Sequence, residues 1–268
     1  MRYDAFIFDM DGVLLDTSKS FITAAVEAVA YVTGTKRFTA AEGVRLKTIP
    51  GFNNDWHVAI AGACWIDYFP DLAFQTYVER LDRLGGGLKA LQQLVPYLTP
   101  EYKRRLTRLT MEAYGGTTAC QKLYGFDPEN IMVRGYWQSE TPLVAPEQIK
   151  PISKKAGIVT GRAEAELQMG FERLGWSLPE KVVAWSDDPD LDKPNPSKLI
   201  RIINNLGADK PVYIGDTRDD LELVKNYRQD TGRTMDFCFI GSRDGIQDFD
   251  LNYRNVTEFL QTIGRGHG

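Results

Sequence analysis

Two carboxylates near the start of the chain are the residues best placed to do chemistry. Asp9 and Asp11 directly follow residues 3–8, an aromatic and β-branched stretch typical of a buried strand. Side chains alternate along a strand, so both carboxylates would share a face if extension continued, and Gly12 allows a sharp turn beyond them. Like charges this close repel unless a cation or a shared proton lies between them. The stretch therefore suggests a magnesium and acid/base site, although an isolated Asp-x-Asp is more often a polar turn.

Further polar segments lie at the ends of expected strands or in the loops between them. They are Thr160-Gly161-Arg162, Lys193-Pro194 and Gly215-Asp216-Thr217-Arg218-Asp219-Asp220. In an open parallel sheet, ligands bind outside the carboxyl ends of the strands. We therefore expect these segments to gather with Asp9 and Asp11 at one edge of a sheet.

The second half of the chain alternates strands with helices. Strands are expected at 156–160, 182–185, 211–214 and 237–240, and helices at 163–174, 195–206, 219–227 and 257–263. This alternation predicts a doubly wound parallel sheet of the α/β class. The first strand can pair only by joining that sheet, so the α/β domain is expected to comprise residues 1–16 and 151–268.

Residues 17–150 are predicted to form an inserted helical domain. Apolar residues recur there at helical spacing, for example across 20–33. Thr39 and Glu42 have the spacing of a capping box. Glycine runs at 85–87 and 115–116 predict breaks between helices.

Composition excludes several classes of protein. The 268 residues are 43% hydrophobic and carry a net charge of −4, which argues against binding to nucleic acid or an anionic membrane. No apolar run reaches the roughly 18 residues of a spanning helix, and the N-terminus does not resemble a signal peptide, so we expect a cytoplasmic protein. The three cysteines are far apart and predict neither a zinc site nor a disulfide framework. The oligomeric state is left open.

The polar segments together resemble a known family. Asp9-x-Asp11-Gly12-Val13-x-x-Asp16, Thr160, Lys193-Pro194 and Gly215-Asp216-x-x-x-Asp220 are similar to the four ordered motifs of the haloacid dehalogenase-like hydrolases. The helical insertion after the first motif resembles the cap of the β-phosphoglucomutase and phosphoglycolate-phosphatase branch. The resemblance implies a Rossmann-like core and a cap domain, but no motif covers the cap, and residues 17–150 exceed the size usual in that branch.

The resemblance also implies a role for each motif carboxylate. Asp9 would be the nucleophile that forms an aspartyl-phosphate, and Asp11 would protonate the leaving alcohol and then deprotonate water. Mg²⁺ would be held by Asp9, the carbonyl of Asp11 and Asp216, with Asp220 behind them holding a water or orienting Lys193. An acid at Asp11 favours phosphate esters over organic halides.

The phosphate group would be bound by a second set of residues. These are Asp9, Met10, Asp11, Thr160, Gly161 and Lys193, acting through backbone N–H groups after Asp9, the hydroxyl and N–H of Thr160, and the charge of Lys193. Two residues stay ambiguous. Asp16 either orients the crossing between domains or caps the next helix, and Arg162 either touches the substrate or lies at the surface.

Specificity would come from the inserted domain. The first candidate is Asn53, Asn54, Asp55 and Trp56, whose amides and indole suit a hydroxyl-rich molecule, although the same residues can simply start a helix. A second candidate is the segment 136–140.

The predicted function is a Mg²⁺-dependent phosphatase acting on a small phosphate ester, such as a sugar or polyol phosphate. Two alternatives remain open: a phosphomutase of the β-phosphoglucomutase type, which would use the same core residues, and a catalytically idle ligand-binding protein.

Overall fold

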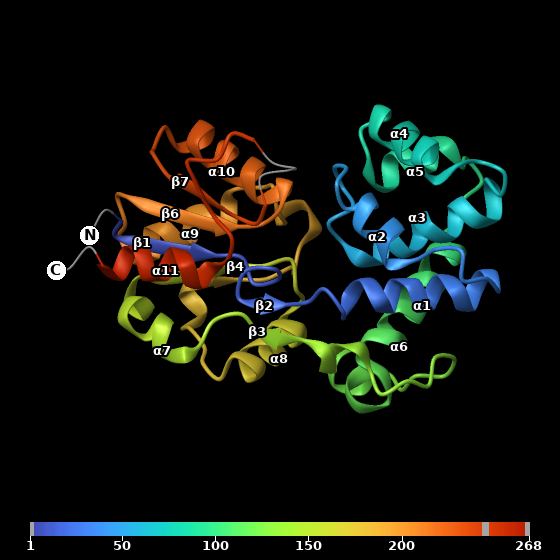
Figure 1. Ribbon diagram of the computed structural model, residues 1–268, viewed down its shortest axis with the longest axis horizontal. Helices are drawn as coiled ribbons and strands as arrows, with labels where there is room; N and C mark the ends of the chain where they lie inside the picture. The colour runs from blue at the N-terminus through green and yellow to red at the C-terminus, as the bar shows by residue number, and fades with distance from the viewer. Residues whose placement is uncertain (1–2, 243–246, 266–268) are drawn as a thin grey trace. The chain divides into compact units, whose positions relative to one another are not determined.

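The computed structural model describes residues 3–242 and 247–265. The chain divides into two compact units, which are considered separately (Figure 1). Residues 1–16 and 141–268 make up the α/β unit, and residues 17–140 make up the helical unit.

The α/β unit is built on a six-stranded sheet. Its strands are β1 (Ala5–Phe8), β4 (Ala156–Val159), β5 (Val183–Ala184), β6 (Pro211–Gly215), β7 (Asp236–Ile240) and β8 (Leu251–Tyr253). Every neighbouring pair is parallel, and the order is β5-β4-β1-β6-β7-β8. All four residues of β1 are buried, as expected for the centre of a parallel sheet. The predicted fold class is confirmed.

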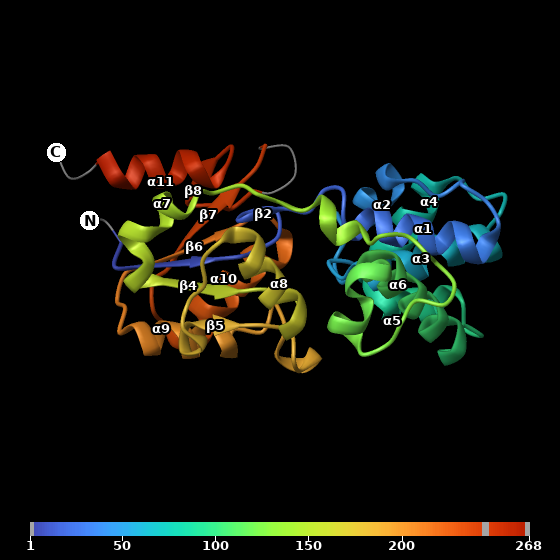
Figure 2. The ribbon, with the colours of Figure 1, turned by 90° about the horizontal axis from the view of Figure 1, so that it is seen from below.

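Helices cover both faces of this sheet. They are α7 (Pro146–Ile149), α8 (Glu164–Leu174), α9 (Ser197–Leu206), α10 (Arg218–Thr231) and α11 (Val256–Arg265), with short 3₁₀ turns at Lys150–Lys155, Glu180–Val182 and Pro189–Leu191. The ring of Phe6 meets Phe259 of α11 edge-to-face. The adjacent Ile7 points to the opposite face, where Ile202 of α9 closes over Gly157. Figure 2 shows α11 and α9 on opposite sides of the strands.

Two short strands of the α/β unit form a separate two-stranded sheet. β2 (Leu15–Asp16) pairs antiparallel with β3 (Thr141–Pro142), and Leu143 N–H donates to Leu14 O. Residues 141–150 thus lie in the α/β unit, where Val144 and Ile149 join its core. The division falls after residue 140 and not after residue 150, because Pro142 lies in β3, which pairs with β2, and Pro146 begins α7.

The helical unit contains six helices among its described residues. They are α1 (Phe21–Thr33), α2 (Ala40–Leu46), α3 (Asp55–Tyr68), α4 (Phe74–Arg83), α5 (Gly87–Leu94) and α6 (Pro100–Tyr124), followed by the 3₁₀ turn η1 (Tyr136–Ser139). The predicted capping box of Thr39 and Glu42 is present at the start of α2. The predicted break in α6 is also present, because Gly116 adopts φ 58°, ψ −165°, and Thr117 N–H bonds Val133 O.

Several short elements were not anticipated, among them β2, β3 and α7. α5 begins at Gly87, directly after a glycine run that had suggested only a break, and β8 is a three-residue edge strand with no strong apolar pattern. In the described part of the chain, no helix combines the length and apolar character needed to cross a membrane.

Candidate active site

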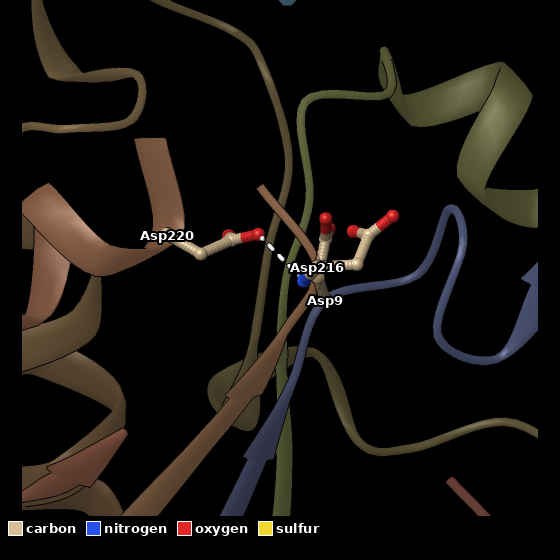
Figure 3. A group of neighbouring side chains, drawn as sticks. All are labelled: Asp9, Asp216 and Asp220. Carbon is tan, nitrogen blue, oxygen red and sulfur yellow. Dashed lines mark hydrogen bonds between the residues drawn. The ribbon is translucent and has the colours of Figure 1, made fainter. Parts of the chain in front are cut away.

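Three carboxylates meet where neighbouring strands end. Asp9 follows β1, Asp216 follows the adjacent β6, and Asp220 lies in the first turn of α10. One oxygen of each lies within 4.8 Å of the others (Figure 3). Because β1 and β6 are parallel neighbours, their carboxyl ends bring Asp9 and Asp216 side by side without any contribution from distant loops.

The turn after Asp9 is shaped to admit Asp216. Gly12 has φ 76°, Gly12 N–H bonds Leu15 O at 2.8 Å, and Leu14 N–H bonds Met10 O at 2.8 Å. A Cβ on Gly12 would lie 2.0 Å from Asp216 Oδ2. Only glycine satisfies both the positive φ and this close approach, so the predicted turn residue also makes room for the second carboxylate.

Lys193 links two of the carboxylates. Its Nζ lies 2.9 Å from Asp9 Oδ1 and 2.8 Å from Asp220 Oδ1, and its side chain is buried. Burial disfavours the lysine charge, but Asp220 and Asp9 outweigh that effect and hold the pKa of Lys193 well above its ordinary value. Lys193 is therefore a fixed positive charge beside Asp9.

The loop that delivers Lys193 is held by a second lysine. Lys198 Nζ lies 2.6 Å from Asp187 Oδ1, 3.0 Å from Asp192 Oδ1 and 2.6 Å from Trp185 O. These contacts tie the start of α9 to the acidic stretch before Lys193, and so fix the approach of that residue.

Both carboxylate oxygens of Asp220 accept hydrogen bonds from neighbouring groups. Oδ1 accepts from Lys193 and from Tyr213 Oη, at 2.8 and 2.9 Å. Oδ2 accepts from Thr217 Oγ1 at 2.7 Å and from the N–H groups of Thr217 and Asp216 at 3.1 and 3.3 Å, the last drawn in Figure 3. With five donors on two oxygens, Asp220 orients the site more readily than it binds a cation.

Asp9 and Asp216 together carry more negative charge than Lys193 can balance. Burial raises the pKa of Asp9 to about 7; Lys193 lowers it, and Asp220 and Asp11 raise it further. Burial and the neighbouring Asp9 and Asp220 raise the pKa of Asp216 well above its ordinary value. Asp216 Oδ1 is buried with no hydrogen-bond partner among the described residues. An orphaned oxygen beside a second buried carboxylate fits a hard divalent cation, with Asp9 and Asp216 as its protein ligands.

Asp11 is engaged by Arg162. The guanidinium Nε lies 2.9 Å from Asp11 Oδ1 and Nη2 lies 2.6 Å from the same oxygen. Arg162 is 1% exposed, so neither earlier interpretation of it, as a substrate contact or as a surface residue, describes its place.

The predicted phosphate-binding residues are only partly as expected. The hydroxyl of Thr160 accepts from Arg162 N–H at 3.2 Å, but Thr160 N–H donates to Ala184 O at 3.0 Å, because the pairing of β4 with β5 extends past the strand end. That N–H is therefore not available to phosphate, contrary to expectation. Met10 N–H bonds Asp9 Oδ1 at 2.7 Å, while Gly161 is exposed next to Thr160.

The candidate specificity residues have structural roles within the helical unit. Asn54 caps α3, its Oδ1 accepting from Trp56 N–H at 2.9 Å, and Asp55 pairs with Lys47 at 2.8 Å. Trp56 packs edge-on against Phe21, Tyr114 and Tyr124. Asn53 is half-buried, and among the described residues it makes no capping, ion-pair or ring contact of this kind. In the second candidate segment, Trp137 Nε1 bonds Thr118 Oγ1 at 3.0 Å and Ser139 Oγ bonds Lys19 O at 2.8 Å.

Two residues of the site were missed by sequence reasoning. Arg162 was noticed but not connected to Asp11, and Tyr213 was counted only as part of a strand. The one available signal for Tyr213 was its hydroxyl in an otherwise apolar run, since a buried hydroxyl requires a partner.

Comparisons with known proteins indicate the haloacid dehalogenase-like hydrolases. The model of the haloacid dehalogenase-like hydrolase family matches residues 146–231, a span that includes Thr160, Lys193, Asp216 and Asp220. Pyrophosphatase PpaX of Bacillus velezensis is 22% identical over 158 residues, 58% of this chain and 72% of that protein. Pyrophosphatase PpaX of Halalkalibacterium halodurans is 27% identical over 184 residues, 67% of this chain and 81% of that protein.

Solved structures share the fold. Phosphatase Tt82 from Thermococcus thioreducens superposes with a TM-score of 0.71 at 23% identity, covering 97% of this chain and 99% of the other. A hydrolase from Pseudomonas syringae gives a TM-score of 0.59 at 16% identity, covering 97% and 98% of the two chains.

Proposed function

We propose that this chain, a haloacid dehalogenase-like hydrolase of the phosphatase branch, is a Mg²⁺-dependent phosphatase that cleaves a small phosphate ester through an aspartyl-phosphate on Asp9. The observation that carries the proposal is the pairing of the buried Asp9 with the half-buried Asp216, with Lys193 as the cation beside Asp9. A carboxylate is a poor nucleophile toward an anionic phosphoryl group, and such a site can offset that repulsion.

Asp9 attacks through Oδ2, the oxygen that accepts no hydrogen bond within the described part of the chain. Both donors to its carboxylate, Met10 N–H and Lys193 Nζ, converge on Oδ1. Oδ2 is then the oxygen that bonds to phosphorus as the bond from phosphorus to the leaving oxygen breaks. Lys193 stays within reach of the phosphoryl oxygens and balances their charge.

Asp11 carries the proton in both halves of the reaction. It gives a proton to the leaving oxygen when the aspartyl-phosphate forms, and it takes one from the water that then attacks phosphorus. The second attack breaks the bond between Asp9 Oδ2 and phosphorus, which releases inorganic phosphate and restores the carboxylate.

Mg²⁺ bound by Asp9 and Asp216 would supply charge neutralisation for the phosphoryl group and for both carboxylates. Asp220 would keep Lys193 and the backbone at Asp216 in place, and the carbonyl of Asp11 is proposed as a further ligand. The three cysteines are free and buried, which suits the reducing cytoplasm proposed as the site of action.

The nucleophile is tested by replacing Asp9. We expect Asp9→Asn to lower the release of p-nitrophenol from p-nitrophenyl phosphate with Mg²⁺ by at least about 10³-fold, because the amide cannot form the phosphoryl-enzyme. Wild-type protein quenched in acid should carry the mass of one phosphoryl group, and Asp9→Asn should not. Asp230→Asn, an exposed carboxylate at the end of α10, is the matched control and should keep wild-type turnover. Undiminished turnover in Asp9→Asn contradicts the mechanism.

A second candidate is hydrolysis of inorganic pyrophosphate, favoured by the two relatives named as pyrophosphatases. A panel of pyrophosphate, sugar phosphates and polyol phosphates compared by kcat/KM separates it from the ester phosphatase. Isomerisation of a hexose 1-phosphate without release of phosphate would instead identify the phosphomutase alternative. Binding without any turnover across the panel would identify the idle protein.

A further inference from the structure

Arg162 is held in the α/β unit by its own backbone. Its N–H donates to Thr160 Oγ1 at 3.2 Å, and its carbonyl accepts from Ser186 N–H at 2.8 Å. These bonds fix the residue directly after the end of β4, next to the end of β1 where Asp9 and Asp11 lie. The side chain therefore starts from a rigid point beside the carboxylate cluster.

Three hydrogen bonds of the guanidinium go to Asp11. Nε reaches both carboxylate oxygens, Oδ1 at 2.9 Å and Oδ2 at 3.2 Å, and Nη2 reaches Oδ1 at 2.6 Å. Nη1 is anchored at 3.1 Å on Glu166 O, at the start of α8. The planar fork thus fixes the direction of the Asp11 side chain as well as neutralising its charge.

The two side chains of this pair differ in their exposure to solvent. The Arg162 side chain is 1% exposed and that of Asp11 is 30% exposed. The arginine therefore approaches from inside the protein, while the carboxylate stays open to solvent on its other side. Another arginine of the same unit has a different partner: Arg201 Nη2 bonds the backbone carbonyl Val183 O at 2.9 Å.

We propose that Arg162 is a positioning residue for the proton-transfer step, holding Asp11 in the one direction from which it can reach the leaving oxygen and the attacking water. This inference rests on the proposed function. The pair occupies Asp11 in the resting protein, so Asp11 must loosen one of these bonds while it carries a proton. The contribution of Arg162 is therefore greatest when the leaving group cannot depart without a proton.

Leaving-group dependence distinguishes this role from a structural one. An alkoxide must be protonated as it leaves, whereas p-nitrophenolate departs as an anion. Hydrolysis of the aspartyl-phosphate is common to all substrates, so kcat/KM is compared, because it reports only the steps up to formation of that intermediate. We expect Arg162→Met to lower kcat/KM for glycerol 2-phosphate by about 100-fold, the scale of one general acid. The loss for p-nitrophenyl phosphate should be about ten times smaller. Arg162→Lys keeps the charge without the fork and should recover part of the loss. Equal losses on both substrates overturn the proposal.

A double-mutant cycle tests whether Arg162 acts through Asp11. In an Asp11→Asn background the acid is already gone, so adding Arg162→Met should lower kcat/KM for glycerol 2-phosphate no further. If Arg162→Met costs the same factor in both backgrounds, Arg162 acts independently of Asp11 and the inference is wrong. Arg201→Met is the matched control, an arginine in the same unit whose loss should not change the ratio of the two substrates.

Folding is checked separately because Arg162 is buried. Thermal unfolding of each variant is compared with that of Arg201→Met, and if Arg162→Met does not fold, Arg162→Lys carries the cycle. In addition, the NMR signal of the Arg162 Nε–H should shift in Asp11→Asn, and an unchanged signal overturns the pairing. If the wild type shows no turnover that depends on Asp9, the proposed function itself is refuted. If that turnover is present but Arg162→Met loses the same factor on both substrates, only the role of Arg162 is refuted.

Discussion

The pKa values of carboxylates are shifted in opposite directions in the two units. In the helical unit, Glu112 accepts from Asn130 N–H at 2.8 Å, Ile131 N–H at 3.0 Å and Arg108 Nε at 3.3 Å. Burial works against its charge, but the hydrogen bonds from Ile131 and Asn130 outweigh that cost and lower the pKa of Glu112. In the α/β unit, burial and like charges raise the pKa of Asp9 and Asp216 instead.

This difference distinguishes a structural carboxylate from one that is proposed to be functional. Glu112 is matched by donors from its own unit and holds the segment at 130–131 against α6. Asp216 has an oxygen without a partner among the described residues, and three carboxylates of its cluster share Lys193 as their nearby lysine. A folded chain tolerates such a deficit where a ligand or cation removes it, so the direction of the pKa shift marks where to look for function.

Replacing Asp216 should show the largest effect. We expect Asp216→Asn to reduce Mg²⁺-dependent turnover by at least about 10³-fold, because several kcal/mol of charge stabilisation are lost with the metal ligand. The same change relieves like-charge repulsion, so the metal-free variant should unfold at or above the wild-type temperature. Differential scanning fluorimetry with EDTA and with Mg²⁺ checks both statements: Mg²⁺ should raise the midpoint of the wild type only. A variant that is less stable without metal would remove the contrast with Glu112.

Replacing Glu112 should act on stability instead. In Glu112→Gln, the NH₂ group of the amide replaces an oxygen that accepts hydrogen bonds, so some of the donors around it lose their acceptor. The change should cost about 2–3 kcal/mol in the free energy of unfolding. The pKa of Glu112 is lowered in the folded protein from its ordinary 4.5, so its stabilisation is present above that value and is lost as pH falls through the folded pKa. Urea titrations at neutral and acidic pH should show a shallower acid loss in the variant.

Glu129 offers the control for this experiment. It pairs with the same Arg108 at 2.9 Å, but its side chain is 73% exposed. Glu129→Gln should therefore leave the unfolding free energy and its pH dependence close to wild type. If Glu129→Gln is as costly as Glu112→Gln, the matched donors of Glu112 are not what stabilises the helical unit.

The smallest expected effect is at Tyr213. Its hydroxyl donates to Asp220 Oδ1 at 2.9 Å, and Tyr213→Phe should cost about 1–2 kcal/mol in unfolding free energy. Turnover should fall only severalfold, because Asp220 retains its other donors. Tyr227→Phe removes a buried hydroxyl elsewhere in the same unit and controls for the deletion itself. A drop in turnover equal in both variants would argue against a link from Tyr213 to the site.

Local pattern was sufficient for much of the α/β unit. Asp9 and Asp216 could be placed together because each directly follows a buried strand, and parallel strands end at one edge. The pairings of Arg162 with Asp11 and of Tyr213 with Asp220 could not be predicted from the sequence. They depend on which side chains face each other across strands and helices. No spacing rule in the sequence encodes that register.

The helical unit was harder to interpret for a related reason. Asn54 and Trp56 look alike whether they bind a ligand or start a helix, and the structure uses them as a cap and as packing against Phe21. Short elements were also missed where tertiary pairing outweighs propensity, as in β8, which forms because it lies beside β7.

The central position of β1 also bears on how the protein is made. Its neighbours β4 and β6 lie beyond the inserted helical unit in the chain. During synthesis the entire helical unit therefore emerges from the ribosome before either partner of β1 exists. Until then, the apolar strand Ala5–Phe8 has no sheet to join, and the cluster of Asp9, Asp216 and Asp220 can assemble only once translation has passed Asp220.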